Sequence, residues 1–196
     1  MRNVPLEPDY VAEVKRNYNG IREAARNSAV GGTRPQSTRA FFSVTPNQRR
    51  VLLEDAWKQG GLSMLGTFSD LMQNEEANEQ VAEFVRGKIG EIVKNPVTAE
   101  ALKPRGYPIF ARRPCLDSSY YETYNLPQVH LIDLLNDDDI VEITEKGVRL
   151  RKGGEIELDM LILATGYDGL TGALLNFDVV GRDGRTVKDK WKDGAR

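Results

Sequence analysis

The chain has 196 residues, enough for one domain or two small ones with a buried core. Its net charge of −2 gives no general attraction to nucleic acid or to an anionic membrane surface. No stretch approaches about 20 consecutive apolar residues and no secretory signal opens the chain, so neither a membrane span nor export is expected. A cytoplasmic location is the default expectation.

The rare residues exclude several kinds of chemistry. A single cysteine, Cys115, cannot form an internal disulfide, and together with the single histidine, His130, it cannot build a zinc site of the usual kind. A Ser-His-Asp triad would have to use His130 as its base. That histidine lies in an apolar, strand-like run, where a structural role is more common. The composition therefore argues against hydrolase and metal-dependent functions.

The first hundred residues have the spacing of helices. Pro8-Asp9 opens one helical segment, which gives way to a loop composition over residues 30–38. Thr45-Pro46 is a cap and first turn, and Gly60-Gly61 ends that helix.

The clearest helix runs from Asn74 to Asn95. Asn74 can cap it, and apolar residues recur every four positions at Ala77, Val81, Val85, Ile89 and Val93. Pro96 stops it, and a short helix follows before Lys103-Pro104.

After residue 105 the pattern predicts short strands at residues 129–133, 140–144, 148–151 and 156–164, with turns at 145–147 and 152–154. The run 160–164 has no alternation, which predicts a strand buried on both faces of a mostly parallel sheet. The expected fold class is α/β, or α+β for this chain taken alone, with a helical module joined near residue 105 to a β-rich one.

Two motifs could carry chemistry. Arg112 and Arg113 stand before Pro114, in a loop preceding a helix at 118–124. Paired guanidinium groups bind phosphate oxygens in a fork, although surface arginines are often only solvated. The run ending at Thr165-Gly166 matches the carboxyl end of a strand, where α/β folds bind ligands, or it is simply a strand and a turn. The chain has neither a Gly-x-Gly-x-x-Gly loop nor a Walker loop, so it lacks the usual pyrophosphate site.

Several stretches together carry a family resemblance: Ala56 to Gly61, Glu76 to Asn78, Phe84 to Ile89, Arg113-Pro114, Tyr120 to Asn125, and Leu158 to Leu174. With these, the chain resembles Baeyer–Villiger monooxygenases of the cyclohexanone and phenylacetone type over essentially its whole length. The resemblance implies FAD and NADPH as cofactors. It also implies a small ketone as substrate, into which one oxygen atom of dioxygen is inserted to give an ester or lactone. No nucleic-acid or membrane partner is implied.

The resemblance also implies roles for single residues. Arg113 matches the family's catalytic arginine, which lies near the flavin, stabilises an anionic flavin intermediate and helps to position the nicotinamide. Arg112 stands where the family usually has a lysine that contacts the 2′-phosphate of NADPH. Arginine keeps that charge, but the change leaves the strength of the NADPH preference open. Thr165, Gly166 and Asp168 match a linker that contacts cofactor between the NADPH and FAD domains.

By the same comparison, residues 1–107 match a helical insertion of the NADPH domain. Residues 108–160 match the second part of that domain, and residues 161–196 match the linker and the start of the returning FAD domain. The chain is then expected to be an internal piece of a monooxygenase. By itself it would be inactive, hold either cofactor weakly and tend to aggregate. The alternatives are a non-catalytic helical binding module and a related flavin monooxygenase that oxidises nitrogen or sulfur.

Overall fold

The computed structural model describes residues 5–28, 31–32, 37–115, 117–134, 136, 138–166, 169 and 171–195. The chain divides into two compact units, Met1–Asp133 and Leu134–Arg196. The helical unit thus extends beyond residue 105, where the sequence pattern changes. The assignment of residues 1–107, 108–160 and 161–196 to parts of larger domains stays a prediction.

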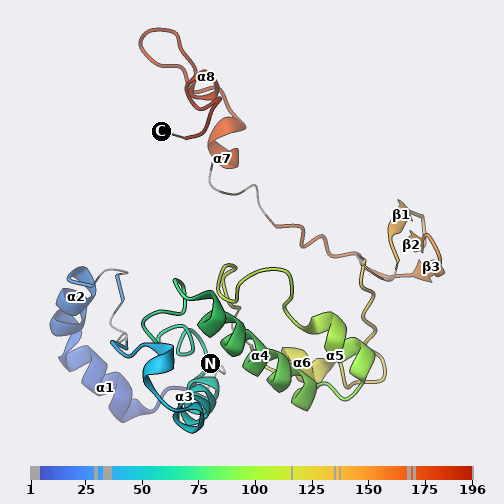
Figure 1. The fold of residues 1–196 in the computed structure, drawn as a ribbon. Coiled ribbons are helices and arrows are strands. Elements are labelled where there is room, and N and C mark those ends of the chain that lie inside the picture. Colours follow the sequence, from blue (N-terminus) through green and yellow to red (C-terminus); the bar gives the residue numbers. More distant parts are fainter. Residues whose placement is uncertain are drawn as a thin grey trace. The chain divides into compact units, whose positions relative to one another are not determined.

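The first unit is built from helices (Figure 1). They are α1 (Pro8–Arg16), α2 (Tyr18–Arg26), the 3-10 helix η1 (Phe41–Ser43), α3 (Pro46–Gln59), α4 (Glu75–Ile92), α5 (Pro96–Leu102) and α6 (Tyr120–Thr123). The predicted starting signals are confirmed for the two longest helices. Thr45 and Gln48 form a capping box on α3, and the Asn74 side chain accepts a hydrogen bond from the Ala77 N–H at the start of α4.

The larger core of this unit lies between α3, α4 and the segment that joins them. Its buried members are Phe41, Leu53, Ala56, Met64, Phe68, Leu71, Ala77, Val81, Ala82 and Ile109. At its edge the rings of Trp57 on α3 and Phe84 on α4 meet edge to face, with centroids 6.4 Å apart. Lys88 of α4 pairs with Glu54 of α3 at 2.9 Å. The motifs at 56–61 and 84–89 therefore join these two helices.

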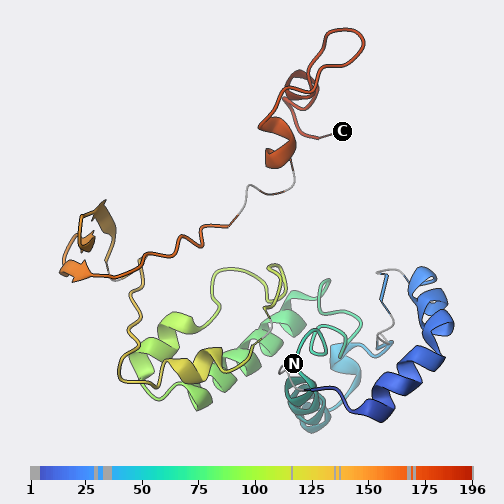
Figure 2. The ribbon, with the colours of Figure 1, turned by 180° about the vertical axis from the view of Figure 1, so that it is seen from behind.

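A smaller core lies at the other end of α4, where α5 and α6 contact it (Figure 2). Ile89, Val93 and Ala99 are its buried members, and Tyr121 and Tyr124 pack against them. Asn125 binds the backbone at the C-terminal end of α4. Its amide nitrogen donates to the Ile92 carbonyl at 2.9 Å, and its amide oxygen accepts from the Lys94 N–H at 2.8 Å.

The second unit holds a small antiparallel sheet in the order β1 (Ile140–Ile143), β2 (Gly147–Leu150) and β3 (Gly154–Glu157). Two short helices follow, α7 (Gly172–Leu175) and α8 (Val187–Lys190). The turns fall at the predicted positions. Only Val148 and Leu150 are buried hydrophobic residues among those described in this unit, so its apolar core is very small.

The predicted strand at 129–133 is wrong, and the one at 156–164 is confirmed only at residues 156–157, which belong to β3. Residues 129–133 form no strand, and His130 is exposed. Residues 158–164 also lie outside any strand, and Met160, Ile162 and Leu163 are 75%, 78% and 72% exposed where burial on both faces was expected. A strand needs hydrogen-bonding neighbours, and the described part of this chain supplies none for 160–164. The described chain accordingly combines helices with an antiparallel sheet, not with a parallel one.

Candidate functional site

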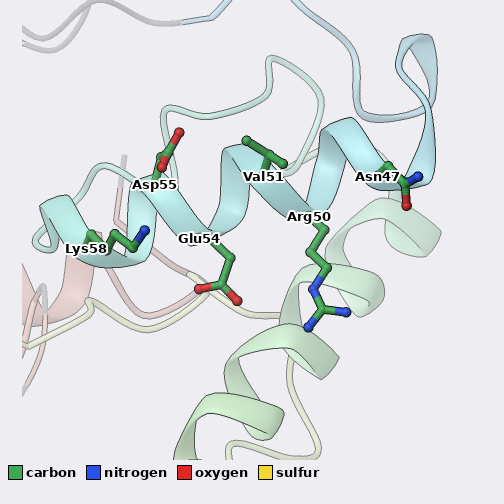
Figure 3. Close-up of a pocket in the computed structure, with 6 residues that line it drawn as sticks. All are labelled: Asn47, Arg50, Val51, Glu54, Asp55 and Lys58. Carbon is green, nitrogen blue, oxygen red and sulfur yellow. The ribbon is translucent and has the colours of Figure 1, made fainter.

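A shallow hollow lies along one face of α3. Its lining residues all come from that helix: Asn47, Arg50, Val51, Glu54, Asp55 and Lys58 (Figure 3). It carries two basic and two acidic side chains, and Glu54 is already paired with Lys88. A single helix face of this composition is typical of a solvated surface. The hollow therefore provides no convergent set of groups for catalysis.

The arginine pair lies in a loop of the helical unit, residues 110–115, which we call the arginine loop. Arg112 and Arg113 are both exposed, and Pro114 between them and Cys115 is half-buried. The Arg112 guanidinium carbon lies 4.6 Å from the centre of the Tyr107 ring. Two exposed cations on one loop can bind an anionic group such as a phosphate.

The start of this loop is anchored by α4. Asn78 is 5% exposed, and its amide nitrogen donates to the carbonyl oxygens of Leu71 and Ile109, both at 3.0 Å. Its amide oxygen accepts from the Ile109 N–H at 2.8 Å. Because both backbone groups of Ile109 are bound, Ile109 is fixed in place as well as in orientation.

A second anchor, Arg86, lies about two turns further along α4. Arg86 is buried and donates to the Pro104 carbonyl at 3.2 Å, while it pairs with Glu79 and Glu83. Burial opposes the positive charge of Arg86, but the hydrogen bonds to Glu83 and Glu79 outweigh it and raise the pKa of the guanidinium. This arginine therefore stays charged and serves the structure, in contrast to the exposed pair at 112–113.

The relative strengths of these contacts show which one controls the loop. A cation–π contact at an exposed site contributes about 0.5–1 kcal/mol. Leaving a buried polar group unpaired costs about 1–3 kcal/mol, and Asn78 makes three such bonds. The hydrogen bonds of Asn78 therefore hold the loop more strongly than the contact between Arg112 and Tyr107.

A cluster of tyrosines follows the arginine loop. The ring of Tyr120 lies 5.3 Å from those of Tyr121 and Tyr124, edge to face in both cases, and the Tyr124 hydroxyl donates to that of Tyr120 at 2.9 Å. Burial raises the pKa of Tyr121, and burial together with the bond to Tyr120 raises the pKa of Tyr124 to about 12. These hydroxyls therefore stay neutral at ordinary pH, and the rings of Tyr121 and Tyr124 pack against the smaller core at the end of α4.

The other predicted site residues lie in the second unit. Thr165 and Gly166 are exposed and outside regular structure, and Gly166 has a φ of +81°, which favours glycine. Asp168 lies outside the described residues. Thr165 and Gly166 thus belong to the second unit, whereas the arginine loop belongs to the helical unit.

The described residues contain no group of three or more metal-ligating side chains, and none of their helices is long and apolar enough to cross a membrane. Cys115 is a free, exposed thiol.

Asn78 was not among the residues that the sequence motifs indicated as functional. Its signal was present, because it is a polar residue next to the apolar positions Ala77 and Val81 of the clearest helix. An asparagine in a helix interior is disfavoured unless its amide has a specific partner.

The chain is similar in sequence to known monooxygenases. No family model matches the chain. It is 42% identical over 194 residues to cyclohexanone 1,2-monooxygenase of an Acinetobacter species, an alignment that covers 98% of this chain and 35% of that protein. The chain is homologous to Baeyer–Villiger monooxygenases. The resemblance noted in the sequence is thereby confirmed.

A solved structure supports the same relationship. A steroid monooxygenase bound to NADP superimposes with a TM-score of 0.91 at 38% identity, covering 98% of this chain and 36% of that one. The chain thus spans about a third of the length of the Baeyer–Villiger monooxygenases it matches.

A further relative bears on the type of oxidation. Phenazine N-monooxygenase PhzNO1 of Lysobacter antibioticus is 39% identical over 186 residues, which cover 94% of this chain and 34% of that protein. Similarity over this segment is therefore shared with a protein named for oxidation at nitrogen.

Proposed function

We propose that this chain supplies the arginine loop of a Baeyer–Villiger monooxygenase that uses FAD and NADPH to insert one oxygen atom of dioxygen into a ketone. The observation that supports it most directly is the 42% identity with cyclohexanone 1,2-monooxygenase over 98% of the chain. The two exposed guanidinium groups of the loop suit the anionic groups of such cofactors. The substrates and activity belong to a protein about three times as long.

The roles proposed for the two arginines differ. Arg113 holds a fixed positive charge at the reacting end of the flavin and stabilises negative charge there as it develops. Arg112 binds the 2′-phosphate of NADPH, with its guanidinium supported by the ring of Tyr107. The flavin, when bound, supplies the oxygen-activating chemistry. Thr165, Gly166 and Asp168 are proposed to contact cofactor at the linker that leads into the FAD domain.

The chain has no glycine-rich loop for a pyrophosphate. We therefore propose that the pyrophosphates of both cofactors are held by other parts of the complete enzyme. Residues 1–107 would form the helical insertion of the NADPH domain, and residues 108–160 its second part. The chain alone is then expected to bind FAD and NADPH only weakly.

A graft tests this proposal. The matching segment of cyclohexanone 1,2-monooxygenase is replaced by this chain, and lactone formation and NADPH oxidation are measured. We expect the graft to be active, and Arg113→Ala to lower kcat by about 100-fold or more, the loss typical for removing one preorganised electrostatic group. Arg112→Ala is expected to raise the KM for NADPH while leaving that for NADH nearly unchanged.

Arg105→Ala is the matched control, because Arg105 is an exposed arginine paired only with Glu100 outside the arginine loop. Equal activity of the Arg113→Ala and Arg105→Ala grafts would contradict the proposed role of Arg113. A graft that is inactive with or without Arg113 would favour the alternative of a non-catalytic helical binding module.

Oxidation at nitrogen is the second candidate, favoured by the relative named for it. The same graft distinguishes the two, because a phenazine substrate would yield an N-oxide and a cyclic ketone a lactone.

A further inference from the structure

The anchor of the arginine loop is a single buried side chain. The three hydrogen bonds of the Asn78 side chain all go to main-chain atoms, and two of them bind the N–H and the carbonyl of Ile109. This set requires two N–H donors and one acceptor on a single side chain, which the Asn78 amide provides, whereas a hydroxyl has one donor and a carboxylate has none. Neither a carboxylate nor a hydroxyl of similar size reproduces this set.

The backbone between Ile109 and the arginines is also restricted. Phe110 has a φ of +70°, a left-handed conformation that is unfavourable for a bulky residue, and its side chain packs against the larger core. The Ala111 N–H then donates to the Pro108 carbonyl at 3.1 Å. Only two residues therefore separate the clamped Ile109 from Arg112, and both have restricted conformations.

The residues before Ile109 are held as well. Arg86 of α4 binds the Pro104 carbonyl, so the segment 105–108 lies between two α4 anchors. That segment carries Tyr107, whose ring lies under the Arg112 guanidinium. The segments that carry Tyr107 and Arg112 are thus both held by side chains of α4.

We propose that Asn78 is a positioning residue: it fixes the direction in which the arginine loop leaves α4 and so the place of Arg112 and Arg113. This inference rests on the proposed function for its catalytic meaning. The mechanical part concerns this chain alone and is tested without any cofactor.

The lone cysteine makes the test direct. Cys115 is exposed, is the only cysteine and lies two residues after Arg113, so a nitroxide spin label there reports the motion of the loop. In the full chain we expect Asn78→Ala to sharpen the spectral lines of the label, which shows faster motion. Asn95→Ala is the matched control. Asn95 accepts hydrogen bonds from the Val97 and Thr98 N–H groups at the start of α5, so this change also removes amide–backbone bonds from a helix but leaves Ile109 bound.

A second measurement covers the case in which Asn78→Ala fails to fold. In the unsubstituted chain, the Ile109 amide is expected to exchange with solvent as slowly as that of Ile89 in the middle of α4. If Asn78→Ala folds, the exchange of Ile109 should quicken by about ten-fold, because one hydrogen bond of a buried group is lost.

Fast exchange of Ile109 in the unsubstituted chain would overturn the proposal. So would an equal response of the label to Asn78→Ala and Asn95→Ala. Neither result depends on Arg113 having a role in catalysis. Conversely, an inactive graft with a rigid label would refute the proposed function and leave the anchoring role of Asn78 intact.

Discussion

Tyr124 shows how one half-buried tyrosine can link stability to pH. Burial against Ile89, Val93 and Ala99, followed by the hydrogen bond to Tyr120, raises its pKa from 10.0 to about 12. Between these values the unfolded chain has lost the tyrosine proton while the native chain keeps it. The unfolded state then binds fewer protons, so the free energy of unfolding falls as the pH rises.

Tyr124→Phe removes this titration. We expect the unfolding free energy of the unsubstituted chain, minus that of Tyr124→Phe, to fall between about pH 10 and about pH 12. Urea unfolding followed by circular dichroism measures both values. Tyr10→Phe, at an exposed ring of α1, controls for the loss of a tyrosine. Parallel pH profiles for the chain and the Tyr124→Phe variant would contradict the assignment.

At the scale of elements, α4 joins every other part of the helical unit's core. One end contributes Ala77, Val81 and Ala82 to the larger cluster, and the other contributes Ile89 to the smaller one. The same helix carries Asn78 and Arg86, the two anchors of the segment that leads to the arginines. Packing and site geometry are therefore set by one helix.

Ile89→Ala tests the contribution of this helix to stability. Ile89 is 0% exposed, so its truncation leaves a cavity and is expected to lower the free energy of unfolding by about 2–5 kcal/mol. Urea unfolding measures the change. Val97→Ala on α5 is the control, since Val97 is 74% exposed and should matter little. Similar losses for the two variants would show that α4 does not form a core at Ile89.

The elements also show what the sequence could and could not predict. A helix satisfies its own backbone, so local signals such as Thr45 and Asn74 were enough to locate α3 and α4. The strands at 140–143 and 147–150 were likewise found, because each pairs with a neighbour across a short turn. The run 160–164 failed because its burial depends on partners that the described chain does not supply.

The sequence likewise indicated one part of the candidate site and not another. The arginine pair was visible in the sequence because its chemistry lies in the side chains themselves. Asn78 was not recognised, because its role depends on a contact with Ile109, which is 31 residues away. Residue type indicates charge, whereas only the fold indicates which backbone a buried amide will meet.

At the scale of the whole molecule, the two units differ in how much apolar surface they bury. The helical unit contains both hydrophobic clusters, whereas the second unit leaves Met160, Ile162 and Leu163 largely exposed in one continuous segment. Contiguous exposed apolar residues of an extended segment favour association between chains. The tendency of the purified chain to aggregate should therefore originate in residues 158–163.

Ile162→Lys is expected to reduce this aggregation, because it places a charge in the middle of the segment. Light scattering at increasing protein concentration measures the effect. Val97→Lys gives the matched control, since Val97 is an isolated apolar residue of similar exposure. A monomeric unsubstituted chain with a sharp thermal transition, or an equal effect of both lysines, would contradict this origin.

The hydrogen bonds between Asn78 and Ile109 have a consequence for how the two positions can diverge. Asn78 contacts only main-chain atoms of residue 109, which every amino acid except proline provides. Position 109 should therefore tolerate substitution by other apolar side chains that fit the core. Position 78 has no such freedom, since no other side chain offers the same donor and acceptor at that reach. A mutational record of this protein would thus show one tolerant and one intolerant partner in a single contact.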